Sequence, residues 1–195
     1  ARAKMSKPRD LDPNISIWPG KSKLVAKPGN LNRKSDHHVY IRKLSWDKKN
    51  TTTLKSDSNI HLISLNVRGI RDKIKRSKIF RWLCHQKCNI IFLQETFVTN
   101  DIENVIRTEW NGTCYFSNGT NHSKGVAILI RNDLLLTSVK CYSRGEGRII
   151  ALQFDCVDNT YFCVNIYAPA KSSEKDIFYK LLNVWVSKNK CETDS

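Results

Sequence analysis

Three short apolar runs of this chain each lead into a polar side chain that is suited to phosphate chemistry. The three residues are Asn66, Glu95 and Tyr167. Carboxylate and amide oxygens are ligands that a hard cation such as Mg²⁺ accepts. A tyrosine hydroxyl can donate to a phosphate oxygen and stabilise charge that develops there. These residue types are compatible with metal-assisted chemistry on a phosphate, in which Glu95 can bind a metal, Asn66 a metal or a phosphate, and Tyr167 a phosphate oxygen.

Each of these residues also has an ordinary structural interpretation. Asn66 stands three residues before Gly69, and an asparagine that caps a turn is common at such a place. Glu95 is also compatible with an exposed loop or the start of a helix. Tyr167 is also compatible with a tyrosine at the rim of a core whose hydroxyl has found a partner. Taken singly, the three residues leave both interpretations open.

The elements that must position these residues begin near residue 59. Alternating or continuous apolar runs predict strands, and apolar residues at spacings of three and four predict helices. The expected strands are 60–65, 90–93, 113–116, 125–130, 135–142, 148–154 and 161–166. The expected helices are 72–84, 100–108, where Asn100 is the expected cap, and 173–187. Buried strands flanked by helices indicate an α/β layered domain.

Strand alternation at 161–166 makes a sharper prediction. Phe162, Val164 and Ile166 should share one face of the strand, while Asn165 and Tyr167 should lie on the other. Pro169 should end the strand. Tyr167 should therefore lie on the face of the strand opposite to Val164.

Residues 1–58 differ in composition from the rest of the chain. They hold 14 Lys and Arg against 5 Asp and Glu, whereas the whole chain has a net charge of +15. Proline, lysine, serine and asparagine dominate, and apolar residues follow no period. We interpret 1–58 as a basic, disordered tail or linker and 59–195 as a folded domain. The charge favours a nucleic acid as partner, and the tail could bind RNA as well as DNA.

The chain also carries expectations about its compartment. No apolar stretch follows the N-terminal charges, so no secretory signal is recognised, and no run is long enough for a membrane helix. Seven cysteines without a CxxC pair are more typical of reduced, buried thiols than of a disulfide framework. We therefore expect an intracellular protein, located in the nucleus, that is neither secreted nor bound to a membrane.

The order of the motifs is more specific than any one residue. Ser64-Leu-Asn66-x-x-Gly69, then Gln94-Glu95-Thr96, then SKGVAIL at 123–129 and finally NIYAP at 165–169 follow one another along the chain. Over roughly residues 60–187 this order resembles the endonuclease/exonuclease/phosphatase superfamily. More narrowly, it resembles the apurinic-type endonuclease domain of non-LTR (LINE-like) retrotransposons.

The resemblance implies a two-sheet β-sandwich flanked by helices, of which this chain would hold the N-terminal part (an α/β, α+β-type fold). It implies hydrolysis of a DNA phosphodiester with Mg²⁺ or Mn²⁺, and a reverse transcriptase domain in the same parent chain. It assigns metal binding to Asn66 and Glu95 and phosphate contact to Tyr167. Arg68, Asn165 and Arg148 are weaker candidates for contacts with nucleic acid. Ala170 departs from the family, which often has Asn there.

The resemblance also implies residues that this sequence does not show. The family completes its site with a Gly-Asp-x-Asn motif and a late Ser-Asp-His motif, and neither occurs here. A missing general base alone costs on the order of 10²–10⁴ in rate. We therefore expect this chain to be inactive by itself, with an apolar sheet face left uncovered. The alternatives are another phosphoesterase or repair nuclease of the superfamily, or a non-catalytic basic module that binds nucleic acid.

Overall fold

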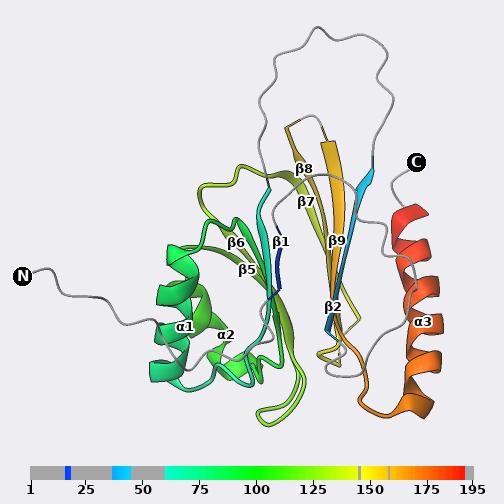
Figure 1. Cartoon of the computed structure of the whole chain (residues 1–195), viewed down its shortest axis with the longest axis horizontal. Coiled ribbons are helices and arrows are strands. Elements are labelled where there is room, and N and C mark those ends of the chain that lie inside the picture. Colours follow the sequence, from blue (N-terminus) through cyan, green and yellow to red (C-terminus); the bar gives the residue numbers. More distant parts are fainter. Residues whose placement is uncertain (1–15, 19–36, 45–59, 145, 158, 192–195) are drawn as a thin grey trace, which may run out of the picture.

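The computed structural model describes residues 16–18, 37–44, 60–144, 146–157 and 159–191. Over these ranges it contains two β-sheets and three helices, as the sequence predicts for an α/β layered protein. Figure 1 shows four layers, with α1 and α2 on one side, the two sheets in the middle and α3 on the other side. The fold class expected from the sequence is therefore confirmed.

The first sheet has five strands in the order β1-β3-β4-β6-β5. Its strands are β1 (Ser16–Trp18), β3 (Leu62–Asn66), β4 (Ile90–Gln94), β6 (Val126–Arg131) and β5 (Gly112–Ser117). β3 and β4 are parallel and are joined through α1 (Lys73–His85), whereas the other pairs are antiparallel. This one parallel pair is decisive for the site, because it brings the carboxyl ends of β3 and β4 to the same edge.

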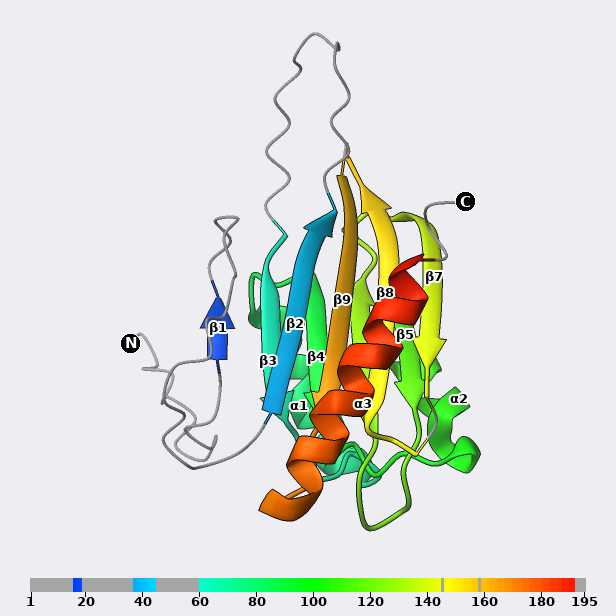
Figure 2. The same ribbon diagram turned by 90° about the vertical axis from the view of Figure 1, so that its right-hand side faces the viewer.

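The second sheet has four strands in the order β2-β9-β8-β7, and all its pairs are antiparallel. Its strands are β2 (His37–Leu44), β9 (Asn159–Tyr167), β8 (Ile149–Cys156) and β7 (Thr137–Ser143). Figure 2 shows α3 (Ser172–Cys191) crossing the outer face of this sheet. Helix α2 (Asn100–Glu109) lies with α1 on the far side of the first sheet.

Three apolar clusters hold the layers together. One joins α1 and α2 to the first sheet through side chains such as Phe80, Leu83 and Ile106. A second fills the space between the sheets, and the third joins α3 to the second sheet. Both faces of the described sheets are therefore covered, contrary to the expectation of an uncovered apolar sheet face. Burying large apolar side chains in this way is the main source of stability in such a fold.

The two faces of β9 divide as alternation predicts. Phe162 and Val164 pack in the cluster under α3, whereas Cys163 and Tyr167 belong to the cluster between the sheets. Tyr167 therefore points toward the first sheet, the sheet that carries Asn66 and Glu95.

Two strands and one helix cap differ from the expectation. The sequence predicts neither β1 nor β2, because nothing in 1–58 has a strand period; the remainder of 1–58 lies outside the described residues. The N-cap of α2 is Thr99 rather than Asn100. Asn100 is instead the first helical residue, and its side-chain oxygen accepts from Asn118 Nδ2 at 2.8 Å.

The described helices include none that is long and apolar enough to cross a membrane. The six described cysteines are free thiols, and four of them are buried, as expected from the sequence. Burial raises the pKa of both Cys114 and Cys163 to about 12, so these two thiols remain protonated and unreactive at neutral pH.

Candidate functional site

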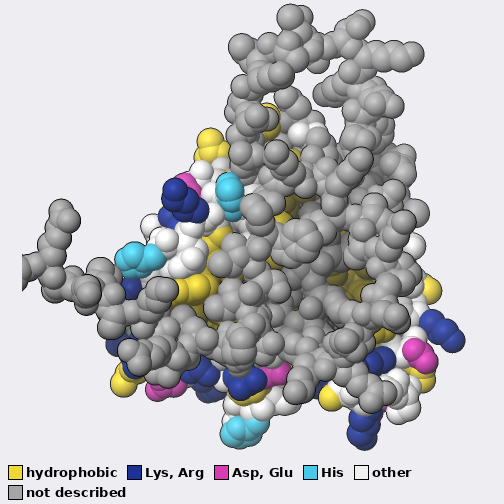
Figure 3. All heavy atoms as spheres, in the orientation of Figure 1, with side chains coloured by type: hydrophobic (Ala, Val, Ile, Leu, Met, Phe, Trp, Pro, Cys, Tyr) yellow, Lys and Arg dark blue, Asp and Glu magenta, His cyan; other side chains and the backbone are white. Residues whose placement is uncertain are grey.

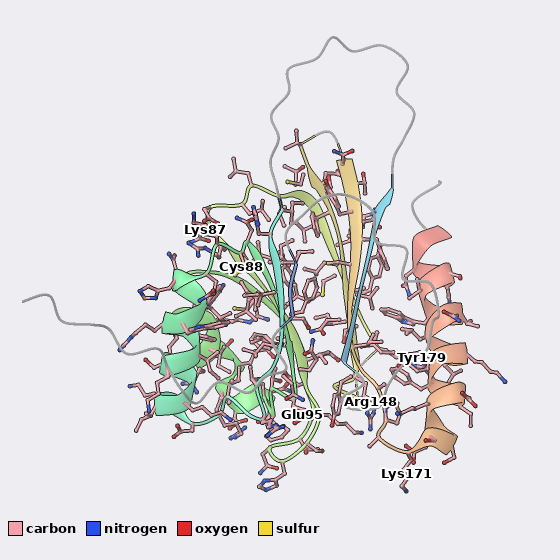
Figure 4. The ribbon with its side chains drawn as sticks, in the orientation of Figure 1. Lys87, Cys88, Glu95, Arg148, Lys171 and Tyr179 are labelled. Carbon is pink, nitrogen blue, oxygen red and sulfur yellow. The ribbon has the colours of Figure 1, made fainter. Side chains whose placement is uncertain are left out.

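The candidate residues meet at one end of the sandwich, which we call the site end. There β3, β4 and β9 finish, and β6 and β8 begin, as the registers Asn66↔Gln94, Gln94↔Val126 and Ile149↔Ile166 show. Figure 4 places Glu95 and Arg148 at this end, on the two facing sheets. Residues that are 29 and 72 positions away from Glu95 along the chain, Asn66 and Tyr167, are thereby brought to the same edge.

Asn66 and Glu95 are held side by side by backbone hydrogen bonds that continue beyond the strands. Val67 N donates to Gln94 O at 2.9 Å, and Gly69 N donates to Glu95 O at 2.6 Å. Gly69 has φ of +85°, and a Cβ there would lie 2.7 Å from a ring carbon of Phe97, so this turn requires glycine. The turn after β3 is thus locked to the segment after β4.

Asn66 also performs the turn-capping role that its sequence context suggested. Its Oδ1 accepts from Arg68 N at 3.1 Å. An amide oxygen has two acceptor lone pairs, so this bond leaves capacity for a second partner. The capping role and the metal-ligand role of Asn66 are therefore compatible.

Glu95 and Tyr167 meet across the two sheets. The Tyr167 hydroxyl donates to the Glu95 carboxylate, and the pKa of Tyr167 is raised first by burial and then by the nearby Glu95 charge. Arg148 opposes this shift. Its guanidinium carbon lies 5.4 Å from the centre of the Tyr167 ring, and its Nη1 donates to Tyr167 O at 3.1 Å. Tyr167 is therefore a fixed hydroxyl that keeps its proton.

Left-handed backbone conformations concentrate at the site end. Of the seven described residues other than glycine with positive φ, five surround it, with φ between 46° and 63°: Arg68, Glu95, Phe97, Lys124 and Glu146. Such conformations cost roughly 1–2 kcal/mol each and gather where a surrounding structure must hold functional groups in place. Glu95 itself is one of them, which argues against an arbitrary surface loop.

Two glycines that the sequence did not mark as functional connect the two sheets at the site end. Gly125 N donates to Gly147 O at 2.9 Å, which joins the start of β6 to the turn before β8 and hence one sheet to the other. A Cβ on Gly125 would lie 2.3 Å from Thr96 Oγ1, and one on Gly147 would lie 2.7 Å from Gly119 Cα. Gly125 lies within SKGVAIL, a motif of the family resemblance, and Gly147 ends the Gly-Glu-Gly segment before β8.

The oxygens at this end fit a hard cation. Glu95 supplies a carboxylate and Asn66 an amide oxygen, while the described residues contain no cluster of three His, Cys, Asp or Glu side chains. Mg²⁺ usually keeps several waters and is bound through one or two carboxylates, so a pair of protein oxygens suits it better than Zn²⁺. Tyr167 bonds the same carboxylate, which has further lone pairs available.

Asn165 lies in the interior rather than on the surface. It is fully buried between the sheets, where its Nδ2 donates to Leu93 O at 2.9 Å and to Ala127 O at 2.8 Å. The structure therefore gives Asn165 no exposed surface for the nucleic-acid contact that was its weaker assignment. Arg68 is exposed and Arg148 half-buried at the site end, so both remain candidates for contact with nucleic acid.

Basic side chains lie around the site. Figure 3, in the same orientation as Figure 4, shows Lys and Arg side chains along the lower edge of the described surface, with Asp and Glu side chains interspersed among them. Lys75, on the first turn of α1, donates from Nζ to Arg68 O at 2.7 Å and so adds a positive charge beside the turn that carries Asn66. Positive charges next to the candidate residues can attract a polyanion to the site end.

No family model matches the chain. A Xenopus laevis protein described as transposon TX1 uncharacterized 149 kDa protein is 27% identical to it over 127 residues. The chain is distantly related to a transposon protein. That stretch is 65% of the chain but 10% of the Xenopus protein, so the chain spans about a tenth of this relative's length.

Proposed function

We propose that this chain carries the metal-binding and phosphate-binding part of a DNA endonuclease site. The family would be the endonuclease/exonuclease/phosphatase superfamily, in the branch found in non-LTR retrotransposons. The observation that carries the proposal is the meeting of Asn66, Glu95 and Tyr167 at one end of a two-sheet sandwich. The relation to a transposon protein supports the choice of branch.

Each residue has a definite task in this proposal. Glu95 and Asn66 hold Mg²⁺ or Mn²⁺, which supplies Lewis-acid stabilisation of charge on a phosphate. Tyr167 keeps its proton because its pKa is raised, and its hydroxyl donates to a phosphate oxygen when DNA is bound. Arg148 holds the Tyr167 ring and backbone in place and adds positive charge beside it.

DNA is the substrate class that fits the charge. The chain has a net charge of +15, and Arg68 is exposed beside Asn66. The basic residues of 1–58 extend the same preference to RNA, and a transposon context suggests a reverse transcriptase in the parent protein and action in the nucleus. A small soluble phosphoester would not need so large a positive charge.

The structure describes the side chains of three histidines, of which His61 and His85 lie away from the site end; His37 and His38 begin β2, in register with Tyr167 and Ile166. His61 lies at the other end of β3, where its backbone N–H donates to Asn89 Oδ1 at 3.1 Å. His85 lies at the far end of α1, where its Nδ1 contacts Arg81 O at 2.6 Å. His122 is on an exposed loop. Because neither Gly-Asp-x-Asn nor Ser-Asp-His occurs in this sequence, we expect the 195-residue chain to bind metal and DNA at the site end without appreciable nicking.

The proposal is tested by DNA binding with and without the metal. We expect Mg²⁺ to strengthen binding of a short duplex by about tenfold, the size of one charge-assisted contact. Glu95→Gln should abolish this gain. The matched control is Asp133→Asn, which removes the same charge at the opposite end of β6, where Asp133 pairs with Arg131 at 3.3 Å.

The ratio of affinities with Mg²⁺ and with a chelator is the measured quantity, because it cancels the general effect of charge on DNA binding. An equal gain in wild type and Glu95→Gln would contradict the proposal. Binding that ignores Mg²⁺ and disappears when 1–58 is deleted would instead favour the non-catalytic basic module.

A further inference from the structure

A set of hydrogen-bonded polar side chains lies directly inward of the candidate residues, on the same three strands. Each member precedes one candidate residue by one or two positions. The pairs are Ser64 before Asn66, Gln94 before Glu95, and Asn165 before Tyr167. Residues two apart on a strand share a face, so Asn165 lies on the same side of β9 as Tyr167.

Asn165 connects the two sheets. It belongs to β9, but its Nδ2 donates to Leu93 O at 2.9 Å and Ala127 O at 2.8 Å, which are carbonyls of cross-strand partners in β4 and β6. Its Oδ1 accepts from Gln94 Nε2 at 2.6 Å. Both donor hydrogens and the carbonyl are therefore used, and all three bonds reach the opposite sheet.

Gln94 extends this connection to the third strand. Its Nε2 also donates to Ser64 Oγ at 3.1 Å, so β9, β4 and β3 are linked in one chain of hydrogen bonds. Gln94 Oε1 is buried and has no partner among the described residues, which makes Gln94 the less satisfied member. Asn165 is thus the member whose bonds are complete.

A polar set in this place needs a reason beyond packing. The surrounding space between the sheets is filled by apolar side chains such as Phe92, Ile128 and Leu152. Burying an amide costs several kcal/mol unless its bonds are satisfied, and apolar side chains of similar size would avoid that cost. Directional bonds do what apolar contacts cannot, since they fix one relative position of two surfaces.

We propose that Asn165 is a positioning residue that sets the separation of the two sheets at the site end, with Gln94 and Ser64 as its partners. The separation matters because Asn66 and Glu95 stand on one sheet and Tyr167 on the other. Asn165 brings the Tyr167 hydroxyl to the Glu95 carboxylate without itself touching a substrate. This inference rests on the proposed function only for the purpose of the contact between Tyr167 and Glu95, and not for its geometry.

The test compares two changes on the same face of β9. Asn165→Leu removes the three bonds while keeping a similar volume, and Cys163→Ala makes a small apolar lesion two residues away, in the same cluster between the sheets. The full chain is labelled with 3-fluorotyrosine, and the ¹⁹F signal of Tyr167 is assigned by its loss in Tyr167→Phe. Glu95→Gln supplies the signal of Tyr167 without its carboxylate partner.

We expect the Tyr167 signal of Asn165→Leu to move toward that of Glu95→Gln, and the signal of Cys163→Ala to stay with wild type. Mn²⁺ affinity should fall by about tenfold in Asn165→Leu, as for other residues that orient metal ligands, and remain unchanged in Cys163→Ala. A merely structural role for Asn165 predicts that both folded variants keep the wild-type signal, and that result overturns the proposal.

If Asn165→Leu does not fold, Gln94→Met is the second test variant. It removes one bond of Asn165 and leaves the two bonds to the backbone, so a smaller movement of the Tyr167 signal in the same direction is expected. An unmoved signal in Gln94→Met then counts against the proposal. Failure of wild type to bind Mn²⁺ contradicts the proposed metal site, whereas the ¹⁹F signal decides the role of Asn165 without any metal.

Discussion

Replacing Arg76 by methionine should destabilise the fold more than any change on the exposed face of α1. Arg76 is 3% exposed and makes two bonds to the carboxylate of Glu109 on α2, at 2.6 and 2.9 Å. Its Nη1 also donates to Ile70 O at 2.9 Å and Arg71 O at 2.7 Å. One guanidinium thus joins both helices to the turn that follows Asn66.

The size of the effect follows from what the change leaves behind. The buried carbonyl of Ile70 and the part-buried carbonyl of Arg71 lose this donor, and a buried acceptor left unsatisfied costs about 1–3 kcal/mol. The Glu109 side chain is 27% exposed, so water can partly replace its partner. We therefore expect a loss of about 3–4 kcal/mol, at the lower end of the range of about 3–5 kcal/mol for breaking a buried ion pair.

The assay is urea or thermal unfolding of Arg76→Met beside Arg81→Met, an exposed arginine of the same helix. For a chain of this size the loss corresponds to a decrease in Tm on the order of 10 °C, while Arg81→Met should change stability by less than about 0.5 kcal/mol. The double variant Arg76→Met, Glu109→Gln should recover part of the loss. A loss below about 1 kcal/mol in Arg76→Met would refute the reasoning.

The same ion pair predicts a pH dependence, because the Arg76 hydrogen bond lowers the pKa of Glu109. A carboxyl group with a lowered pKa stabilises the fold at pH values above its ordinary pKa, and this contribution is lost as the pH falls through the folded-state pKa. The difference in free energy of unfolding between wild type and Arg76→Met should therefore become smaller in acid. Tyr167 should ionise with a pKa above the ordinary tyrosine value, as ultraviolet titration against Tyr167→Phe can measure. In Glu95→Gln this pKa should fall only part of the way back, since burial is the larger cause of the shift. An unchanged pKa in Glu95→Gln would speak against the contact between Tyr167 and Glu95. Cys163, whose pKa is raised to about 12, should resist alkylation at pH 9 in the folded protein and react once urea unfolds it; rapid reaction without urea would contradict its burial.

The regular elements after residue 59 could be predicted from the sequence because local periods determine them. The expected helix 72–84 is α1 (Lys73–His85), and the expected strand 161–166 is the middle of β9 (Asn159–Tyr167). The alternation of β9 also correctly placed Tyr167 opposite the face that packs against α3. These predictions use only neighbours along the chain.

The missed features depend on contacts between distant segments. β1 and β2 have no strand period and are strands because they pair with the edges next to β3 and β9. Asn165 looks like a surface residue in NIYAP, and only the position of the facing sheet shows that it is buried. The hydrogen bond from Gly125 N to Gly147 O likewise joins two sheets, so no local pattern in the sequence could reveal it.

The most direct test of the proposed site is to count bound Mn²⁺ by electron paramagnetic resonance in wild type, Glu95→Gln and Asp133→Asn. Mn²⁺ prefers the same carboxylate and carbonyl oxygens as Mg²⁺ and gives a signal that decreases when it binds. The account predicts one ion per chain in wild type and in Asp133→Asn, displaced by Mg²⁺, and none in Glu95→Gln. Undiminished binding in Glu95→Gln would contradict it.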